Sequence, residues 1–142
     1  MTSKLTDAVA KLNSLPSKWD FLFLGRRLQQ GEVDEKVNYI DQKNNIVMLP
    51  GVVKPGFSYC LYGYALSRTG VQKLLQAHME KNLIPVDEFV PACYMKHRRP
   101  DIAKIFKPCI SAFALTEDIA FQRTKVSAGS DTEMSATWQS GK

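Results

Sequence analysis

The sequence has no long apolar run. None of its hydrophobic stretches approaches the roughly 18 residues that a membrane-spanning helix needs. The first residues, MTSKLTDAVAKLNSL, also lack the apolar segment of a secretory signal peptide. We therefore expect no membrane span, and any targeting signal would lie outside this sequence.

Cysteine is scarce as well. The three cysteines, Cys60, Cys93 and Cys109, are too few and too widely spaced for a disulfide framework or a zinc site. Each lies among apolar residues, so we expect buried structural thiols. Their odd number leaves at least one thiol unpaired within the chain.

Charge of one sign is not concentrated anywhere along the chain. The formal net charge is +5, but residues 1–71 hold 9 basic against 6 acidic side chains and residues 72–142 hold 10 against 8. A nucleic-acid-binding segment usually shows a clustered basic stripe, so we expect no nucleic-acid partner. The one dense cluster, 96–99 (KHRR), is expected to be solvated surface, with polyanion binding as the weaker alternative.

The 142 residues are 44% hydrophobic, enough for one domain with a core. Apolar spacing predicts a helix over 4–15, ended by Pro16, and a second over 67–82, with Ser67 or Thr69 as its N-cap. His78 lies on the apolar stripe of that second helix, so we expect a packed core histidine.

Strands are predicted by short apolar runs bounded by turn residues. The first is Trp19 to Gly25, with Arg26 and Arg27 at its C-terminal end, where open α/β sheets usually bind ligands. Further strands are expected over 45–51, 56–67, 109–115 and 118–121, whereas polar residues 28–45 read as an exposed loop. The resulting order of helices and strands indicates an α/β fold with few strands.

Two adjacent acids stand out in LIPVDEFVPACYMKHRRP, residues 83–100. Asp87 and Glu88 follow Pro85, which can open a helix, and carboxylates are stabilised in the first turn of a helix. Successive helical residues point about 100° apart, so the two side chains cannot share one direction. Either both acids only stabilise the helix start, or one of them faces a substrate cleft.

Five stretches occur in the order seen in glycosyltransferase family 25: WDFLFLGRR, GFSYCLYGYALSRTGVQKLL, LIPVDEFVPACYMKH, SAFAL and SDTEMSATW. That family contains the collagen beta(1-O)galactosyltransferases, their cell-adhesion relatives and bacterial lipooligosaccharide galactosyltransferases. The chain resembles the animal collagen-type branch from about Trp19 to Trp138, most of its length.

The resemblance implies that residues 1–126 are the C-terminal portion of a GT-A-like, Rossmann-related nucleotide-sugar domain, and that residues 127–142 form a polar tail with the SDTE motif. It implies inverting transfer of galactose from UDP-galactose to a hydroxylysine-type or glycan hydroxyl, with Mn2+, in the endoplasmic reticulum lumen. In such chemistry a base deprotonates the hydroxyl while the metal offsets charge on the departing diphosphate.

The resemblance also assigns roles to residues of this chain. Asp87 is the implied base or acceptor-orienting residue, with Glu88 second. The other implied site residues are Gly25, Arg26, Tyr59 and Tyr64 for substrate or donor binding, and Asp131 and Glu133 for the metal. The plain alternatives are backbone geometry for the glycine, core packing for the tyrosines and a solvated loop for SDTE.

Three departures from the family pattern bear on activity. The acidic metal motif expected before the N-terminal helix does not occur in this sequence, nor does the family's Pro-Thr-His-Tyr segment, and Cys60 replaces a tryptophan. We therefore expect a fragment or degenerate copy that is inactive as an isolated chain. The alternative is a non-catalytic binding or adhesion module. Uncovered strand edges make self-association a further expectation.

Overall fold

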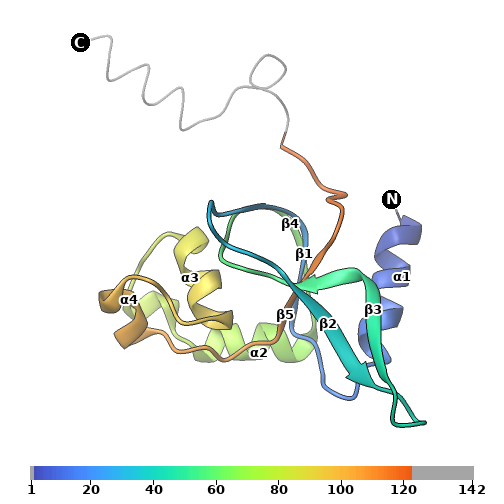
Figure 1. Cartoon of the computed structure of the whole chain (residues 1–142). Coiled ribbons are helices and arrows are strands. Elements are labelled where there is room, and N and C mark those ends of the chain that lie inside the picture. Colours follow the sequence, from blue (N-terminus) through green and yellow to red (C-terminus); the bar gives the residue numbers. More distant parts are fainter. Residues whose placement is uncertain (1, 123–142) are drawn as a thin grey trace.

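The computed structural model of the chain describes residues 2–122, which form one five-stranded sheet with flanking helices (Figure 1). In chain order the elements are α1 (Thr2–Asn13), β1 (Phe21–Leu28), β2 (Glu35–Ile40), β3 (Ile46–Lys54), β4 (Ser58–Leu66), α2 (Arg68–Gln76), η1 (Met79–Lys81), α3 (Val86–Tyr94), α4 (Pro100–Ile105) and β5 (Ala112–Leu115). The predicted α/β class is confirmed, and the arrangement is compatible with part of a Rossmann-like domain. No helix in residues 2–122 is long and apolar enough to cross a membrane.

The sheet is mixed, with strand order β2-β3-β5-β1-β4. Strands β1 and β5 run parallel, and the other neighbours are antiparallel. Because β5 has only four residues, it pairs with β1 only from Phe21 to Phe23. The backbone N–H groups of Ile119 and Ala120 then donate to the Leu24 carbonyl at 2.8 and 3.1 Å. The chain that leaves β5 therefore crosses over β1.

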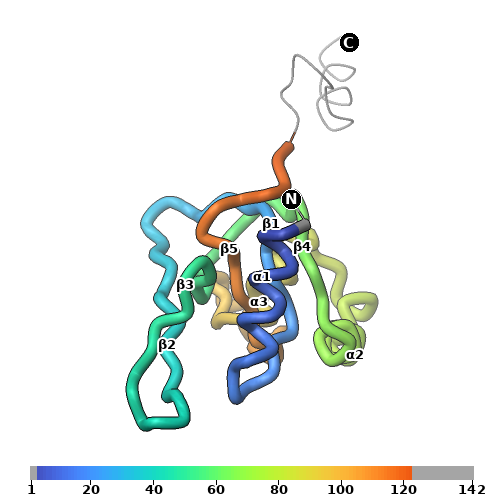
Figure 2. The backbone as a smooth tube through the Cα atoms, turned by 90° about the vertical axis from the view of Figure 1, so that its right-hand side faces the viewer, coloured from blue at the N-terminus to red at the C-terminus, as the bar shows by residue number. Residues whose placement is uncertain are grey.

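Alternation along the central strands separates two apolar cores. Phe21 and Phe23 of β1 point to the face covered by α3 and α4, whereas Leu22 points to the face covered by α1. Figures 1 and 2 show α1 on one side of the sheet and α3 on the other. The near-continuous apolar sequence of β1 is explained by burial on both faces.

A buried carboxylate fixes the start of β1. Asp20 is fully buried and accepts hydrogen bonds from Thr69 Oγ1 at 3.0 Å, Lys73 Nζ at 2.8 Å and the Ser111 backbone N–H at 2.8 Å. Burial alone would raise the pKa of Asp20, but these hydrogen bonds together lower it below its usual 3.8. A Cβ on Gly70 would meet the Asp20 carbonyl oxygen at 2.2 Å, so only glycine lets α2 approach this closely. Asp20 thus joins β1 to α2 and to the chain entering β5.

Two of the strand and loop predictions are wrong. The segment 28–45 contains β2, an edge strand in which only Val37 is buried, so its sequence lacks a clear apolar pattern. Residues 118–121 do not form a strand, although two of their N–H groups bind β1. The first strand also continues beyond Gly25, so Arg26 and Arg27 lie inside β1 rather than after it.

The second predicted helix is too long, and one short helix was not predicted. Helix α2 ends at Gln76, His78 adopts the left-handed conformation at φ 53°, and its exposed ring binds Glu80 at 2.7 Å. The predicted core histidine is therefore wrong. Helix α4, with Pro100 at its first position, was not predicted because it has only six residues. The Ser67 N-cap is confirmed, since its Oγ accepts from the Gly70 N–H at 3.0 Å.

Candidate functional site

Helix α3 carries the two adjacent acids in its first turn, as predicted. Asp87 is half-buried, and its carboxylate has no hydrogen bond or ion pair with any side chain among residues 2–122. The ring of Pro91 lacks an N–H, so the Asp87 carbonyl receives no helical hydrogen bond from that residue. The Asp87 carboxylate is thus free of side-chain partners among residues 2–122, in contrast to its neighbour on the helix.

Glu88 points elsewhere, to a buried imidazole. Glu88 Oε2 lies 2.6 Å from His97 Nε2, and His97 Nδ1 accepts the Arg99 backbone N–H at 3.0 Å. An acceptor Nδ1 places the imidazole proton on Nε2, so the ring donates to Glu88. The Phe57 ring contacts the imidazole edge-on at a centroid distance of 5.2 Å. Glu88 is therefore held by the fold, while its neighbour Asp87 is not.

Tyr59 of β4 lies beside this pair of acids. Partial burial raises the pKa of the Tyr59 phenol, with a further contribution from Glu88 and a smaller one from Asp87, while Arg98 acts in the opposite direction. Tyr59 also packs edge-on against Phe57, at a centroid distance of 5.1 Å. Tyr59 is thus connected to Glu88 through the rings of Phe57 and His97, and both acids lie within electrostatic range of its phenol.

The basic cluster 96–99 is only partly the solvated surface that we expected. Lys96, Arg98 and Arg99 are exposed, but His97 is buried, with 4% of its surface accessible. Arg98 forms an ion pair with Glu32 from the β1–β2 connection, and Arg99 pairs with Asp101 at 2.7 Å. Nothing in the KHRR pattern distinguishes the buried histidine, which is the residue that the sequence reasoning missed.

Arg26 is occupied inside the protein. Its guanidinium, whose side chain is 8% exposed, donates to both Asp34 oxygens, at 2.8 and 2.5 Å, and to Ser58 Oγ at 2.8 Å. Burial would raise the pKa of Asp34, but the Arg26 and Gly56 N–H bonds lower it. The observed role of Arg26 is to fasten the β1–β2 connection to β4, and its predicted donor contact remains a prediction.

The same network positions α3. Tyr94, at the end of this helix, donates to the Gly56 carbonyl at 2.9 Å and accepts the Ser58 N–H at 3.1 Å. Burial raises the pKa of the Tyr94 phenol to about 12, so the hydroxyl keeps its proton and its donor role. The helix that presents Asp87 is therefore fixed to β4 at its far end.

Gly25 and Tyr64 lie elsewhere on β1 and β4. Gly25 sits opposite Gly63, and a Cβ on Gly25 would meet the Ala120 carbonyl oxygen at 2.0 Å. A glycine is therefore required at position 25, because the chain after β5 passes close to the backbone of β1 there. Tyr64 is 48% exposed and stacks on Phe21 at a centroid distance of 5.2 Å. Ligand contacts by these two residues remain predictions.

The predicted metal ligands Asp131 and Glu133 lie outside the described residues. Within residues 2–122, no group of three or more His, Cys, Asp or Glu side chains is arranged to hold a metal ion. The described part of the chain therefore does not fit a Mn2+ site by itself, and we derive no chemical step through the metal.

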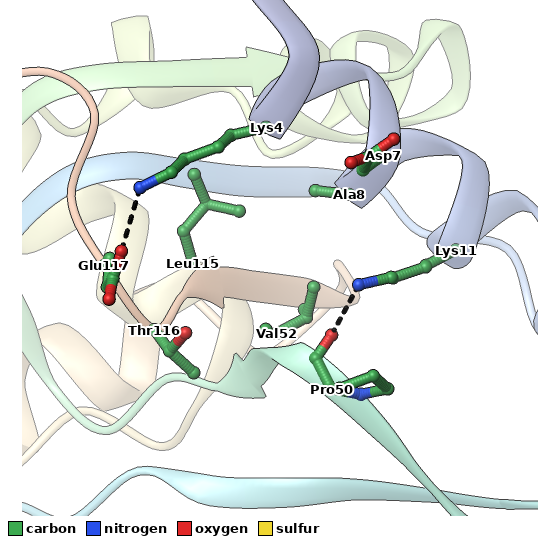
Figure 3. Close-up of a pocket in the computed structure, with 10 residues that line it drawn as sticks. Lys4, Asp7, Ala8, Lys11, Pro50, Val52, Leu115, Thr116 and Glu117 are labelled. Atoms are coloured by element: carbon green, nitrogen blue, oxygen red, sulfur yellow. Dashed lines mark hydrogen bonds and ion pairs between the residues drawn. The ribbon is translucent and has the colours of Figure 1, made fainter. Parts of the chain in front are cut away.

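A hollow between α1, the middle of β3 and the end of β5 is separate from these residues (Figure 3). Lys4 reaches across it to Glu117 at 2.9 Å, and Lys11 donates to the Pro50 carbonyl at 3.2 Å. None of the predicted site residues lines this hollow. Because both lysines are engaged across it, the hollow does not present free cationic groups to a ligand.

These observations define an α/β region with an unpartnered carboxylate at a helix start, next to a fixed carboxylate and a tyrosine. Procollagen galactosyltransferase 1 of Danio rerio is 31% identical over 140 residues, 95% of this chain and 22% of the relative. Procollagen galactosyltransferase 1-A of Xenopus laevis is 32% identical over 140 residues, 95% of this chain and 21% of the relative. Inactive glycosyltransferase 25 family member 3 of Homo sapiens is 32% identical over 124 residues, 84% of this chain and 19% of the relative.

The resemblance drawn from the motifs is thereby confirmed: the chain is a glycosyltransferase 25-like region, similar to procollagen galactosyltransferases over nearly its whole length. It spans about a fifth of the length of these relatives. No protein-family model and no solved structure matches the chain.

Proposed function

We propose that this chain is the part of a family-25 galactosyltransferase that supplies the base, Asp87. The observation that carries the proposal is the contrast between two neighbours on α3: Glu88 is bonded to His97, whereas Asp87 has no side-chain partner in residues 2–122. A half-buried carboxylate fixed by a helix and free of partners suits proton abstraction.

In the proposed reaction, Asp87 takes the proton of an acceptor hydroxyl as the hydroxyl oxygen bonds to the anomeric carbon of galactose. The bond from that carbon to UDP breaks on the opposite side, so the configuration inverts. Tyr59 is the best placed of the four predicted substrate-binding residues, because both acids act electrostatically on its phenol. Its phenol would donate a hydrogen bond to a sugar or acceptor oxygen.

The substrates are proposed from the names of the relatives and the family resemblance: UDP-galactose as donor and a hydroxylysine of a collagen-like chain as acceptor. The endoplasmic reticulum lumen is the corresponding compartment. Mn2+ would need ligands from outside residues 2–122. The procollagen galactosyltransferases match 92–95% of the chain and the inactive relatives 84%, which favours the catalytic reading over the non-catalytic module.

Calorimetric titration of the purified chain with UDP-galactose, with and without Mn2+, tests the donor assignment. We expect binding by the wild-type chain, weakened at least tenfold by Tyr59→Ala and retained by Asp87→Asn, because Asp87 acts on the acceptor. Tyr59→Phe removes only the hydroxyl and keeps the aromatic ring, so it separates the contribution of the hydroxyl to binding from that of the ring. Absence of binding by a chain that circular dichroism shows to be folded would contradict the assignment of the donor to this region.

A further inference from the structure

Two cysteines from different elements meet behind α3. Cys93 lies in the last turn of α3 and is fully buried, as expected. Cys109 lies in the connection that leads to β5 and is exposed, so the prediction of a buried thiol is wrong there. The Cys93 carbonyl accepts the Cys109 N–H at 2.7 Å and the Ile110 N–H at 3.0 Å. These bonds satisfy a carbonyl at the helix end that has no partner within the helix.

The backbone contact limits how far apart the two residues can be. With a 2.7 Å hydrogen bond between Cys109 N and Cys93 O, the covalent bonds on either side hold the Cα atoms within about 6.5 Å. In disulfides the two Cα atoms usually lie about 4.4–6.8 Å apart, most commonly about 5.5–6 Å. The pair therefore satisfies the first geometric requirement for a disulfide without movement of the backbone.

The two thiols also adjoin each other. Burial, then the neighbouring Cys109, raises the pKa of the Cys93 thiol to about 12. Although Cys109 is exposed as a residue, partial desolvation of its thiol raises the pKa of that thiol. Cys60 does not compete for either partner, because it lies on β4 beside Tyr62.

We propose that Cys93 and Cys109 form an intrachain disulfide by exchange with a small-molecule disulfide such as oxidised glutathione. The exposed Cys109 thiolate attacks one glutathione sulfur, the glutathione S–S bond breaks, and one glutathione leaves and takes up a proton. Cys93 then loses its proton to solvent and attacks Cys109 Sγ, which expels the second glutathione. Two protein thiols are oxidised by two electrons, and one oxidised glutathione becomes two reduced molecules.

The bond would close a loop that contains α4 and His97, the partner of Glu88. Its formation would therefore hold the acid-bearing helix and the histidine segment together in the unfolded as well as the folded chain. A compartment with oxidising glutathione would favour the closed form, and a reducing one the open dithiol. The proposal does not depend on the proposed galactosyl transfer.

Peptide mapping under non-reducing conditions tests the proposal on the full chain after incubation with oxidised glutathione in native buffer. We expect a peptide pair linked through Cys93 and Cys109, with Cys60 still free to alkylation. Cys60→Ser should give the same link and Cys109→Ser should give none. A link that involves Cys60, a glutathione adduct that persists on Cys109, or closure only in urea would overturn the proposal.

Thermal unfolding provides a second readout. The oxidised wild-type chain should unfold several degrees above the reduced one, because the loop of residues 93–109 is closed before unfolding. Cys109→Ser, at an exposed position, should show no difference between oxidising and reducing buffer. Equal midpoints for the oxidised and reduced wild type would contradict the expected stabilisation by loop closure, and the peptide map decides whether the bond forms.

Discussion

At the scale of single residues, Asp20 has a structural role: it connects β1 to two distant parts of the chain. Asp20 has no exposed surface, and its carboxylate binds groups from α2 and from the start of β5. The sequence shows it only as an acid between a tryptophan and an apolar run. Its partners are about 50 and 90 residues away, so no local pattern could have predicted them.

Asp20→Asn should lower the free energy of unfolding by about 3 kcal/mol, because Lys73 and the Ser111 N–H lose a buried charged partner. The folded-state pKa of Asp20 lies below 3.8, so its contribution is present above that pH and is lost as the pH falls through the lower, folded-state value. Urea denaturation at pH 7 and pH 3 measures both effects, and the variant should lose less stability on acidification. Asp101→Asn, which alters an exposed ion pair, should unfold at the same urea concentration as wild type.

Two glycines give a second prediction at this scale. Gly25→Ala should destabilise the fold by about 2 kcal/mol, because its Cβ would collide with the Ala120 carbonyl oxygen, a backbone atom. Gly63→Ala would collide with the Ala120 side chain at 2.6 Å. Adding Ala120→Gly should therefore rescue Gly63→Ala but not Gly25→Ala in denaturant unfolding. Equal rescue of both would mean that the chain after β5 does not pass over β1 as described.

At the scale of elements, the sequence predicts what is periodic or continuously apolar. Such patterns located the helices at 4–15 and 67–82 and the strand from Trp19, with shifted ends. The start of α3 was instead predicted from Pro85 and the two acids that follow it. Strand β2 and helix α4 were missed, since one is a polar edge strand and the other a single short helix. The burial of His97 depends on Glu88, nine residues earlier, and on Phe57 of another segment.

The connection between β1 and β2 is held in place by the ion pair between Arg26 and Asp34, and this can be tested. Asp34→Asn removes the charged partner of a nearly buried Arg26, so we expect a loss of about 3 kcal/mol in denaturant unfolding. Because the folded-state pKa of Asp34 is lowered, this contribution too is lost as the pH falls through that folded-state value, below 3.8. If the only role of Arg26 were to bind the nucleotide-sugar donor, the unfolding free energy of the unliganded variant would equal that of wild type.

At the scale of the whole molecule, residues 2–122 form a sheet whose order places β2 at one edge and β4 at the other. Strand β4 carries Tyr59 beside the acids of α3 and the exposed Tyr64 farther along. The chain spans about a fifth of the length of its relatives. In our proposal, Asp87, Glu88 and Tyr59 are therefore part of an active site, and further residues of that site come from outside this chain.

The central claim, that Asp87 is the base, is tested most directly by placing this chain within a complete relative. The matching segment of the Danio rerio procollagen galactosyltransferase 1 would be replaced by this chain, and transfer of galactose to a hydroxylysine-containing collagen peptide measured. We predict an active hybrid whose kcat falls by about 10²- to 10⁴-fold with Asp87→Asn and stays near the hybrid's own value with Asp101→Asn. A hybrid that transfers galactose equally well with and without the Asp87 carboxylate would contradict the account.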